Sequence, residues 1–442
     1  MKTNIYEKKS VNKLILYFSL PAILSLIVEI MASVVDTAFA GHLGNVSVDA
    51  LTAMGLLTPV LNLFTAVQSL FAVSTSIFVA KYLNQKEQCS EYFFCGIIMT
   101  LIVSALLSIS FYFMLNPVLK LLGAKEQVFT LAKTYLRIQL FSNLFSSMGY
   151  TLTSCIRAFG YPKIEMILTS LAVLVNILFN AILVFGLHLG FAGLAYGTLI
   201  SEIFCALSAW IWLSKHQILS KIPRLSLRKF KNCTAKLAKL GIAQTIIQTM
   251  GGFTGFFVNN SLILHTGASY VAVWNVVQNI YTLFLMPTVG ITQGVQTIIA
   301  YFSGQEKEKE KKQAIRSTMT GTVLYGLLST ICIFLFGDTL LSVFIEAGSF
   351  LQIAENVLKI IFVTFPLMGI FYTIVTLLEV TGHELKAIGL ILTRQIFLMI
   401  PLVYFLPLVF PNRSTSIFFS VPIADVIAIL VSVLFSMKTQ TR

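Results

Sequence analysis

Long apolar stretches, separated by short polar segments, repeat along the whole chain. Roughly 20 apolar residues are enough for a helix to cross a membrane, and runs this long are typical of helices rather than strands. Most of the stretches are longer than that, so we expect the helices to tilt, kink or protrude. The pattern predicts twelve membrane-spanning helices, at residues 14–40, 50–80, 92–115, 128–156, 164–187, 190–213, 235–264, 268–301, 314–336, 350–380, 386–410 and 415–437.

The composition agrees with this prediction. Hydrophobic residues make up 57% of the 442 residues and charged residues 11%, whereas soluble domains carry about 25% charged residues. The first apolar run is too long for a cleavable signal, so we interpret it as a retained helix. The six cysteines are scattered without a C-x-x-C motif, which indicates neither a disulfide framework nor a zinc site. The predicted class is an all-α polytopic membrane protein.

The net charge of +13 follows the predicted topology rather than a nucleic-acid footprint. If the N-terminus is cytoplasmic, the inner segments hold 24 of the 31 lysines and arginines. This bias is the positive-inside rule, and it predicts cytoplasmic termini and no nucleic-acid partner. The longest basic segment, residues 215–239, is suited to contact with anionic lipid and marks a boundary between lobes at 1–222 and 223–442.

The two halves of the chain resemble each other at a nearly constant spacing. The triplet at 136–138 matches that at 358–360, and Gly160 matches Gly382 at the same interval. Two homologous six-helix halves have the same orientation and are related by an axis along the membrane normal. Transporters of this build bind substrate between the halves, so the repeat predicts two pseudo-symmetric six-helix lobes around a central cavity.

The first predicted helix contains a carboxylate, Asp36, near its outer end. An ionised Asp at the bilayer centre costs roughly 2.5–3.5 kcal/mol on insertion scales. Asp36 is therefore either solvated near the interface or part of a functional site. Pro21, earlier in the same helix, frees a backbone carbonyl and allows the helix to bend.

Polar residues also recur in the fifth and sixth predicted helices. Asn176 and Asn180 are four residues apart and share one helix face, while Thr198 and Glu202 form a polar side on the next helix. Such side chains often only hold helices together. With Asp36 they also suit an oxygen-rich cage for Na⁺, or a carboxyl that takes up a proton.

The second half offers mainly neutral polar groups. A substrate cavity and simple helix packing are both compatible with them. The 36 Phe and 13 Met favour lipophilic cations as ligands. Together with Glu202, the candidate cavity residues are Gln244, Gln248, Asn260, Asn275, Gln278 and Tyr281.

Four segments of the chain resemble the MATE family of multidrug and toxic compound extrusion transporters, and its DinF-like branch in particular. They are LPAILSLIVEIMASVVDTAFAGHLG, RAFGYPKIEMILTSLAVLVNILFNAILVFG, LGFAGLAYGTLIS, and the region from FPLMGIF to MIPLVYFLP with its Arg394-Gln395 pair. The resemblance implies twelve helices in two lobes and the exchange of organic cations or drugs for Na⁺ or H⁺. It also implies that Asp36 is the coupling residue, with Asn176 and Thr198 completing a cation site. Asn180 stands where the family has an aspartate, so the site has one charge fewer and the ion stays open.

The sequence therefore predicts an antiporter of the cell membrane that exports lipophilic or cationic compounds. We expect a monomer without catalytic residues, and with no cofactor other than the coupling ion. Three alternative functions remain. A flippase for lipid-linked precursors needs a cationic cavity, and few basic residues lie inside the helices, with Arg137 and Arg394 as the exceptions. A membrane-embedded enzyme needs clustered His, Cys or acids, and the five His are dispersed. A channel differs in conducting passively.

Overall fold

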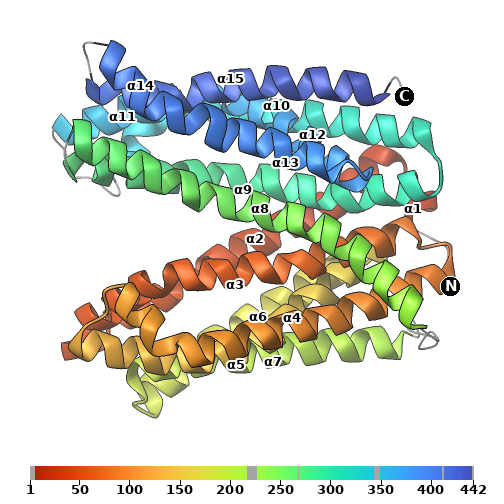
Figure 1. Ribbon diagram of the computed structural model, residues 1–442, viewed down its shortest axis with the longest axis horizontal. Coiled ribbons are helices and arrows are strands. Elements are labelled where there is room, and N and C mark those ends of the chain that lie inside the picture. Colours follow the sequence, from red (N-terminus) through yellow and green to blue (C-terminus); the bar gives the residue numbers. More distant parts are fainter. Residues whose placement is uncertain (1–4, 217–225, 267, 343–348, 411–412, 441–442) are drawn as a thin grey trace. The chain divides into compact units, whose positions relative to one another are not determined.

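The computed structural model describes residues 5–216, 226–266, 268–342, 349–410 and 413–440. Within these ranges, the regular structure is helical throughout, and short turns connect the helices (Figure 1). The chain divides into two compact units. Unit 1 comprises Met1–Ser10 and Leu20–Thr245, and unit 2 comprises Val11–Ser19 and Ile246–Arg442.

Unit 1 holds the helices of the first half of the chain. Two of these helices, α2 and α8, continue into unit 2. The elements are α1 (Ile5–Lys8), α2 (Val11–Gly41), η1 (Gly44–Val46), α3 (Ser47–Lys81), α4 (Lys86–Leu121), α5 (Glu126–Ala158), α6 (Pro162–Ala181), the π-helical turn η2 (Ile182–Gly186), α7 (Gly190–Lys215) and α8 (Leu227–His265).

Unit 2 holds the helices of the second half, together with the remainder of α2 and α8. Its further elements are α9 (Ala268–Gly304), α10 (Glu308–Ser342), α11 (Ser349–Phe362), α12 (Phe365–Val380), α13 (Glu384–Leu392), the π-helical segment η3 (Thr393–Met399), α14 (Ile400–Val409) and α15 (Arg413–Gln440).

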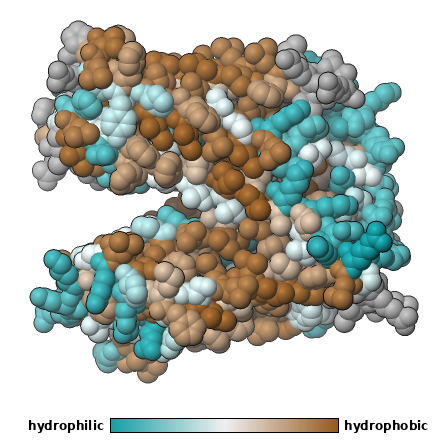
Figure 2. Space-filling view, viewed as in Figure 1, coloured by the Kyte–Doolittle hydropathy of each residue, from teal (hydrophilic) through white to brown (hydrophobic). Residues whose placement is uncertain are grey.

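The predicted class, an all-α membrane protein, is confirmed. In the described part of the chain, nine helices are long and apolar enough to span a membrane, or ten if one bent pair is counted as a span. Figure 2 shows apolar residues over most of the visible surface, with hydrophilic residues gathered near helix ends. This is the pattern expected of helices that lie in lipid.

One stretch predicted as a single helix is interrupted, and a second is continuous but contains a π-helical segment. The stretch at 350–380 is divided into α11 and α12, which meet at an angle of 45°. Pro366 stands in the first turn of α12, where a helix does not need its backbone N–H as a donor. Because proline has no N–H, it cannot donate the hydrogen bond that would continue α11 into α12. The stretch at 386–410 contains the π-helical η3 between α13 and α14. Hydropathy shows neither the bend nor the π-helical segment, because all of these segments are apolar.

The helices repeat along the chain as the sequence does. The starts of α10, α11, α13 and α15 follow those of α4, α5, α6 and α7 at the same interval, to within a single position. Gly160 and Gly382, which precede α6 and α13, have φ angles of 96° and 84°. Glycine adopts this left-handed backbone without strain, so the same turn introduces the same helix in both units.

The predicted lobe boundary at 222 and 223 falls within residues 217–225, outside the described ranges. The first part of α8 belongs to unit 1 and makes polar contacts with other helices of that unit. Lys229 lies 2.7 Å from Glu91 and 3.4 Å from Glu87, and these carboxylates raise the pKa of Lys229 above its ordinary value. Thr245 donates a hydrogen bond of 3.0 Å to the carbonyl oxygen of Ala66.

A close helix contact in unit 2 gives a test of the packing. A Cβ atom added at Gly326 on α10 would lie 2.5 Å from Cα of Pro366, whereas one added at Gly321 on the same helix meets nothing within 4 Å. We expect Gly326→Ala to lower the free energy of unfolding by about 1–3 kcal/mol because the backbone of α12 must shift. Gly321→Ala should be neutral or stabilising by up to about 1 kcal/mol. Thermal unfolding in detergent compares the two, and equal stabilities would contradict the packing.

Candidate cation site

The carboxylate of Asp36 is held by a side chain from another helix of unit 1. Nδ2 of Asn180 on α6 donates a hydrogen bond of 2.6 Å to Oδ1 of Asp36 on α2. Asn180 is completely buried, while Asp36 is half-buried. Asp36 is thus neither directed at lipid nor simply solvated at the outer end of α2.

The hydrogen bonds continue along α6 and across to α7. Nδ2 of Asn180 also donates to Oδ1 of Asn176 at 3.2 Å, and Nδ2 of Asn176 donates to Oγ1 of Thr198 at 3.4 Å. The structure therefore brings together all four residues predicted for the cation site, in one chain of contacts over three helices. Their role in coupling stays a prediction.

Local sequence explains why these groups meet. The spacing of four places Asn176 and Asn180 one above the other on α6. Gly197 on α7 leaves the space that Asn180 fills, since a Cβ added there would overlap Oδ1 of Asn180. Two turns along the same face of α6, Thr169 donates a hydrogen bond of 3.3 Å to the hydroxyl of Ser25 on α2. The polar face of α6 thus contacts both α2 and α7.

The sequence did not reveal two further parts of the site. Tyr135 on α5 is buried within electrostatic range of Asp36, and its hydroxyl hydrogen-bonds with Gln139. Tyr135 stands in a helix rich in aromatic and polar residues, so no pattern distinguishes it. Gly197 is a small residue of an apolar helix, and its specific contact with Asn180 depends on the pairing of α6 with α7.

The site carries one carboxylate, so a single monovalent cation neutralises it. In the described structure, both hydrogens of the Asn180 amide point at acceptors, while Oδ1 of Asn180 is buried without a hydrogen-bond partner. A proton on Asp36 is compatible with this arrangement. Na⁺ requires oxygen ligands, which the amide of Asn180 supplies only after it turns its oxygen toward Asp36.

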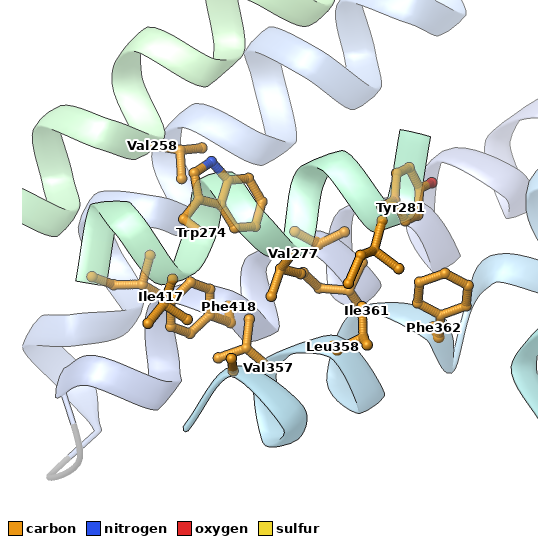
Figure 3. Close-up of a cluster of buried hydrophobic side chains, with 14 of the residues drawn as sticks. Val258, Trp274, Val277, Tyr281, Val357, Leu358, Ile361, Phe362, Ile417 and Phe418 are labelled. Carbon is orange, nitrogen blue, oxygen red and sulfur yellow. The ribbon is translucent and has the colours of Figure 1, made fainter. Parts of the chain in front are cut away.

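The corresponding region of unit 2 is apolar. At the interval that relates the helices, Asn176 and Asn180 correspond to positions 398–399 and 402–403, occupied by Leu, Met, Leu and Val, and Thr198 corresponds to positions 420–421, occupied by Ser and Val. Met399, Val403 and Val421 belong to the hydrophobic cluster around Trp274 and Phe418 that Figure 3 shows. The hydroxyl of Ser420 donates to the carbonyl oxygen of Ile417 at 2.6 Å, and apolar side chains cannot coordinate a cation. Among the described residues, the pair of amides on this helix is therefore a feature of unit 1.

The residues predicted for a substrate cavity are spread over both units. In unit 1, Gln244 and Glu202 are partly buried. In unit 2, Tyr281 packs its ring against Phe362 and Phe365 at centroid distances of 5.8 and 5.5 Å, within the hydrophobic cluster. The exposed residues are Gln248, Asn260 and Asn275, and Gln278 is partly buried. A shared cavity stays a prediction.

Pro21 lies inside a continuous helix. The helix α2 runs from Val11 to Gly41, with Pro21 in its first half. The division between the units falls just before this residue, since unit 2 takes Val11–Ser19 and unit 1 begins again at Leu20. A bend at Pro21 stays a prediction.

Comparison with known proteins places the chain in a family. A family model described as MatE matches residues 21–182 and 244–405, which are one stretch of each half. The chain belongs to the MATE family. Both stretches of the MATE match are of equal length, and their displacement along the chain agrees with the interval between repeated helices.

Relatives and solved structures cover nearly the whole chain. The multidrug export protein MepA of Staphylococcus aureus is 25% identical over 97% of this chain and 94% of its own length, and MepA of Staphylococcus saprophyticus is 25% identical over the same shares. The fold matches an outward-facing MATE transporter of the MOP superfamily with a TM-score of 0.90 at 20% identity, covering 99% and 98% of the two chains. An aspartate-to-asparagine mutant of the Vibrio cholerae MATE transporter VcmN matches with a TM-score of 0.89 at 20% identity, covering 97% of each chain.

The contact between Gly197 and Asn180 gives a test of the site. We expect Gly197→Ala to displace the Asn180 amide from Asp36, to lower the free energy of unfolding by about 1–3 kcal/mol, and to reduce the stabilisation by H⁺ or Na⁺. A Cβ added at Gly186 meets nothing within 4 Å, so Gly186→Ala is the control. Thermal unfolding with and without the cations measures both effects, and an unchanged cation response in Gly197→Ala would contradict the arrangement.

Proposed function

We propose that this protein is a secondary active antiporter that exports organic, mostly cationic compounds in exchange for H⁺ or Na⁺. The observation that carries the proposal is the hydrogen-bonded chain from Asp36 through Asn180 and Asn176 to Thr198. A buried carboxylate in a membrane helix without a cationic partner is costly unless it takes up a cation. Membership of the MATE family and the name of the MepA relatives support export of drugs.

Coupling follows from the charge of Asp36. When the site is open to the outside, Asp36 takes up H⁺ or Na⁺, and the positive charge lowers the affinity for a cationic compound nearby. Each elementary charge that moves inward releases about 2.3 kcal/mol per 100 mV of membrane potential. The cation is released to the cytoplasm, and the compound binds there in its place.

Alternating access uses the two units as the moving parts. The helix α2 carries Asp36 in unit 1, and its first turns belong to unit 2. Pro21 removes one backbone hydrogen bond close to that division, which makes it the point at which α2 bends most easily. Uptake of a cation at Asp36 thus acts on the same helix that connects the units.

The protein resides in the cell membrane with both termini in the cytoplasm, according to the distribution of lysine and arginine. A monomer suffices, because each chain contains both halves of the repeat. Lipophilic or cationic small molecules are the substrates, lipid covers the apolar surface, and the function requires neither a nucleic acid nor a cofactor other than the coupling ion. It involves no covalent chemistry, so the protein is not an enzyme.

The flippase alternative loses support from the placement of the arginines. The structure also places Arg157 inside α5, where it is buried and paired with Glu165 at 2.9 Å. Arg394 is neutralised by Asp425, with Nε lying 2.7 Å from Oδ1. Arg137 lies over the ring of Tyr112 in an exposed part of unit 1. None of these guanidinium groups is free in a buried cavity, as the phosphates of a lipid-linked precursor require.

Transport in everted vesicles tests the coupling. We expect Asp36→Asn to abolish ion-driven uptake of a dye cation, because an asparagine cannot gain and lose a positive charge. Asp338→Asn is the matched control, since Asp338 is exposed and bonds to the neighbouring Thr339. Separate Na⁺ and pH gradients identify the ion. Unchanged ion-driven uptake in Asp36→Asn would refute the proposal.

A second variant separates H⁺ from Na⁺. Asn180→Asp places a second carboxylate next to Asp36, and two such charges favour a shared metal cation. We expect Na⁺ to bind roughly tenfold more tightly than to the native protein. The double variant Asp36→Asn with Asn180→Asp keeps one carboxylate and is the control. Na⁺-dependent shifts of the unfolding temperature measure the affinity, and no gain in Na⁺ response over the control would contradict the proposed geometry.

A further inference from the structure

Two cysteines of unit 1 lie side by side on different helices. The thiols of Cys95 on α4 and Cys233 on α8 are hydrogen-bonding partners. The sulfur of Cys95 also lies 3.9 Å from the carbonyl oxygen of Phe230, one turn before Cys233. All six cysteines of the chain are free, so this pair is a dithiol. Its members are far apart in the sequence, which is why no C-x-x-C pattern indicates them.

The contact belongs to a regular packing of α8 on α4. Lys229 on α8 lies 2.7 Å from Glu91 on α4. One turn further along both helices, Cys233 meets Cys95. Another turn along α8, Leu237 joins the same buried cluster as the two cysteines. The equal steps of four residues show that α4 and α8 run in the same direction here and hold the two thiols at one level.

The packing of α8 on α3 restricts the same part of the helix. A Cβ atom added at Gly241 on α8 would overlap the carbonyl oxygen of Leu70 on α3. One turn later, Thr245 donates a hydrogen bond of 3.0 Å to the carbonyl oxygen of Ala66. The first part of α8 is thus held against two helices of unit 1, and the two thiols stay in contact.

Cys233 is the thiol that a small oxidant reaches first, because it is 6% exposed whereas Cys95 is 0% exposed. Burial raises the pKa of Cys233, which keeps most of it in the unreactive thiol form. The ammonium groups of Lys236 and Lys229 act in the opposite direction and favour the thiolate. The pair therefore reacts slowly and responds to a strong oxidant rather than to a mild one.

We propose that Cys95 and Cys233 are a redox-sensitive site, which hydrogen peroxide converts to a disulfide between α4 and α8. The Cys233 thiolate attacks one peroxide oxygen, the O–O bond breaks, and a sulfenic acid forms while the leaving hydroxide takes up the thiol proton. The sulfur of Cys95 then attacks the sulfenic sulfur, and the S–S bond forms. The sulfenic hydroxyl leaves as water with the Cys95 proton. The two thiols lose two electrons, and the peroxide is reduced to two molecules of water.

The disulfide fixes the first part of α8 to unit 1. A disulfide restricts the unfolded chain, and it does so more strongly when it closes a long loop, as this one does. The helix α8 continues from unit 1 into unit 2, so the crosslink also confines any bending of α8 to the part beyond it. None of the residues of the cation site takes part, and the redox response is therefore independent of the proposed function.

Treatment of the full-length protein in detergent with hydrogen peroxide tests the site. We expect the native protein to lose two hydrogen atoms in its intact mass, and a digest without reductant to contain peptides joined through Cys95 and Cys233. The unfolding temperature should rise by about 3–10 °C, and dithiothreitol should reverse both changes. Cys332→Ser is the control, because Cys332 in unit 2 is more exposed than either partner, and it should respond as the native protein does.

The variants Cys95→Ser and Cys233→Ser each remove one partner. We expect Cys95→Ser to gain one oxygen atom at Cys233, as a sulfenic acid that dimedone labels, and neither variant to gain stability on oxidation. A native protein that loses no hydrogen, or in which each cysteine is oxidised separately, would overturn the pairing. An equal rise of the unfolding temperature in the serine variants would also overturn it. If a serine variant does not fold, Cys95→Ala and Cys233→Ala remove the thiols without burying a hydroxyl.

Discussion

A carboxylate within a membrane helix needs a partner, and the structure of unit 1 is arranged around this requirement. Asp36 receives the Asn180 amide at 2.6 Å, and Asn180 in turn is buried against Gly197 and bonded to Asn176. An amide satisfies part of the hydrogen-bonding capacity of the carboxylate without neutralising its charge. The site is therefore stable enough to form and still gains from a cation, which is the property that coupled transport requires.

The two halves of the repeat differ in how their buried carboxylates are partnered. Unit 2 fills the position of the cation site with apolar side chains and neutralises Asp425 with its own arginine. Unit 1 keeps Asp36 without a bonded cation from the described chain. In the proposed function, this difference between two similar folds places the coupling ion in unit 1.

Sequence patterns predicted the helices well because hydropathy and loop charge are properties of single segments. Asn176 and Asn180 were found from their spacing, and Asp36 from its cost in lipid. Tyr135 and Gly197 were not assigned to the site, since their contacts depend on how α5, α6 and α7 pack. The bend between α11 and α12 and the π-helical η3 were not predicted for a related reason: these segments are as apolar as their neighbours. The ring of Tyr281 packs against Phe362 and Phe365, and its role in a substrate cavity stays a prediction.

In the proposed function, Asp36 releases one coupling cation when the protein binds one organic cation. Titration of the purified protein with a cationic dye, in weakly buffered solution with a pH indicator and a Na⁺ electrode, measures this exchange directly. We expect the protein to release about one H⁺ or Na⁺ for each dye molecule that it binds, under conditions in which Asp36 carries its cation. Binding of the dye to saturation without release of either ion would contradict it.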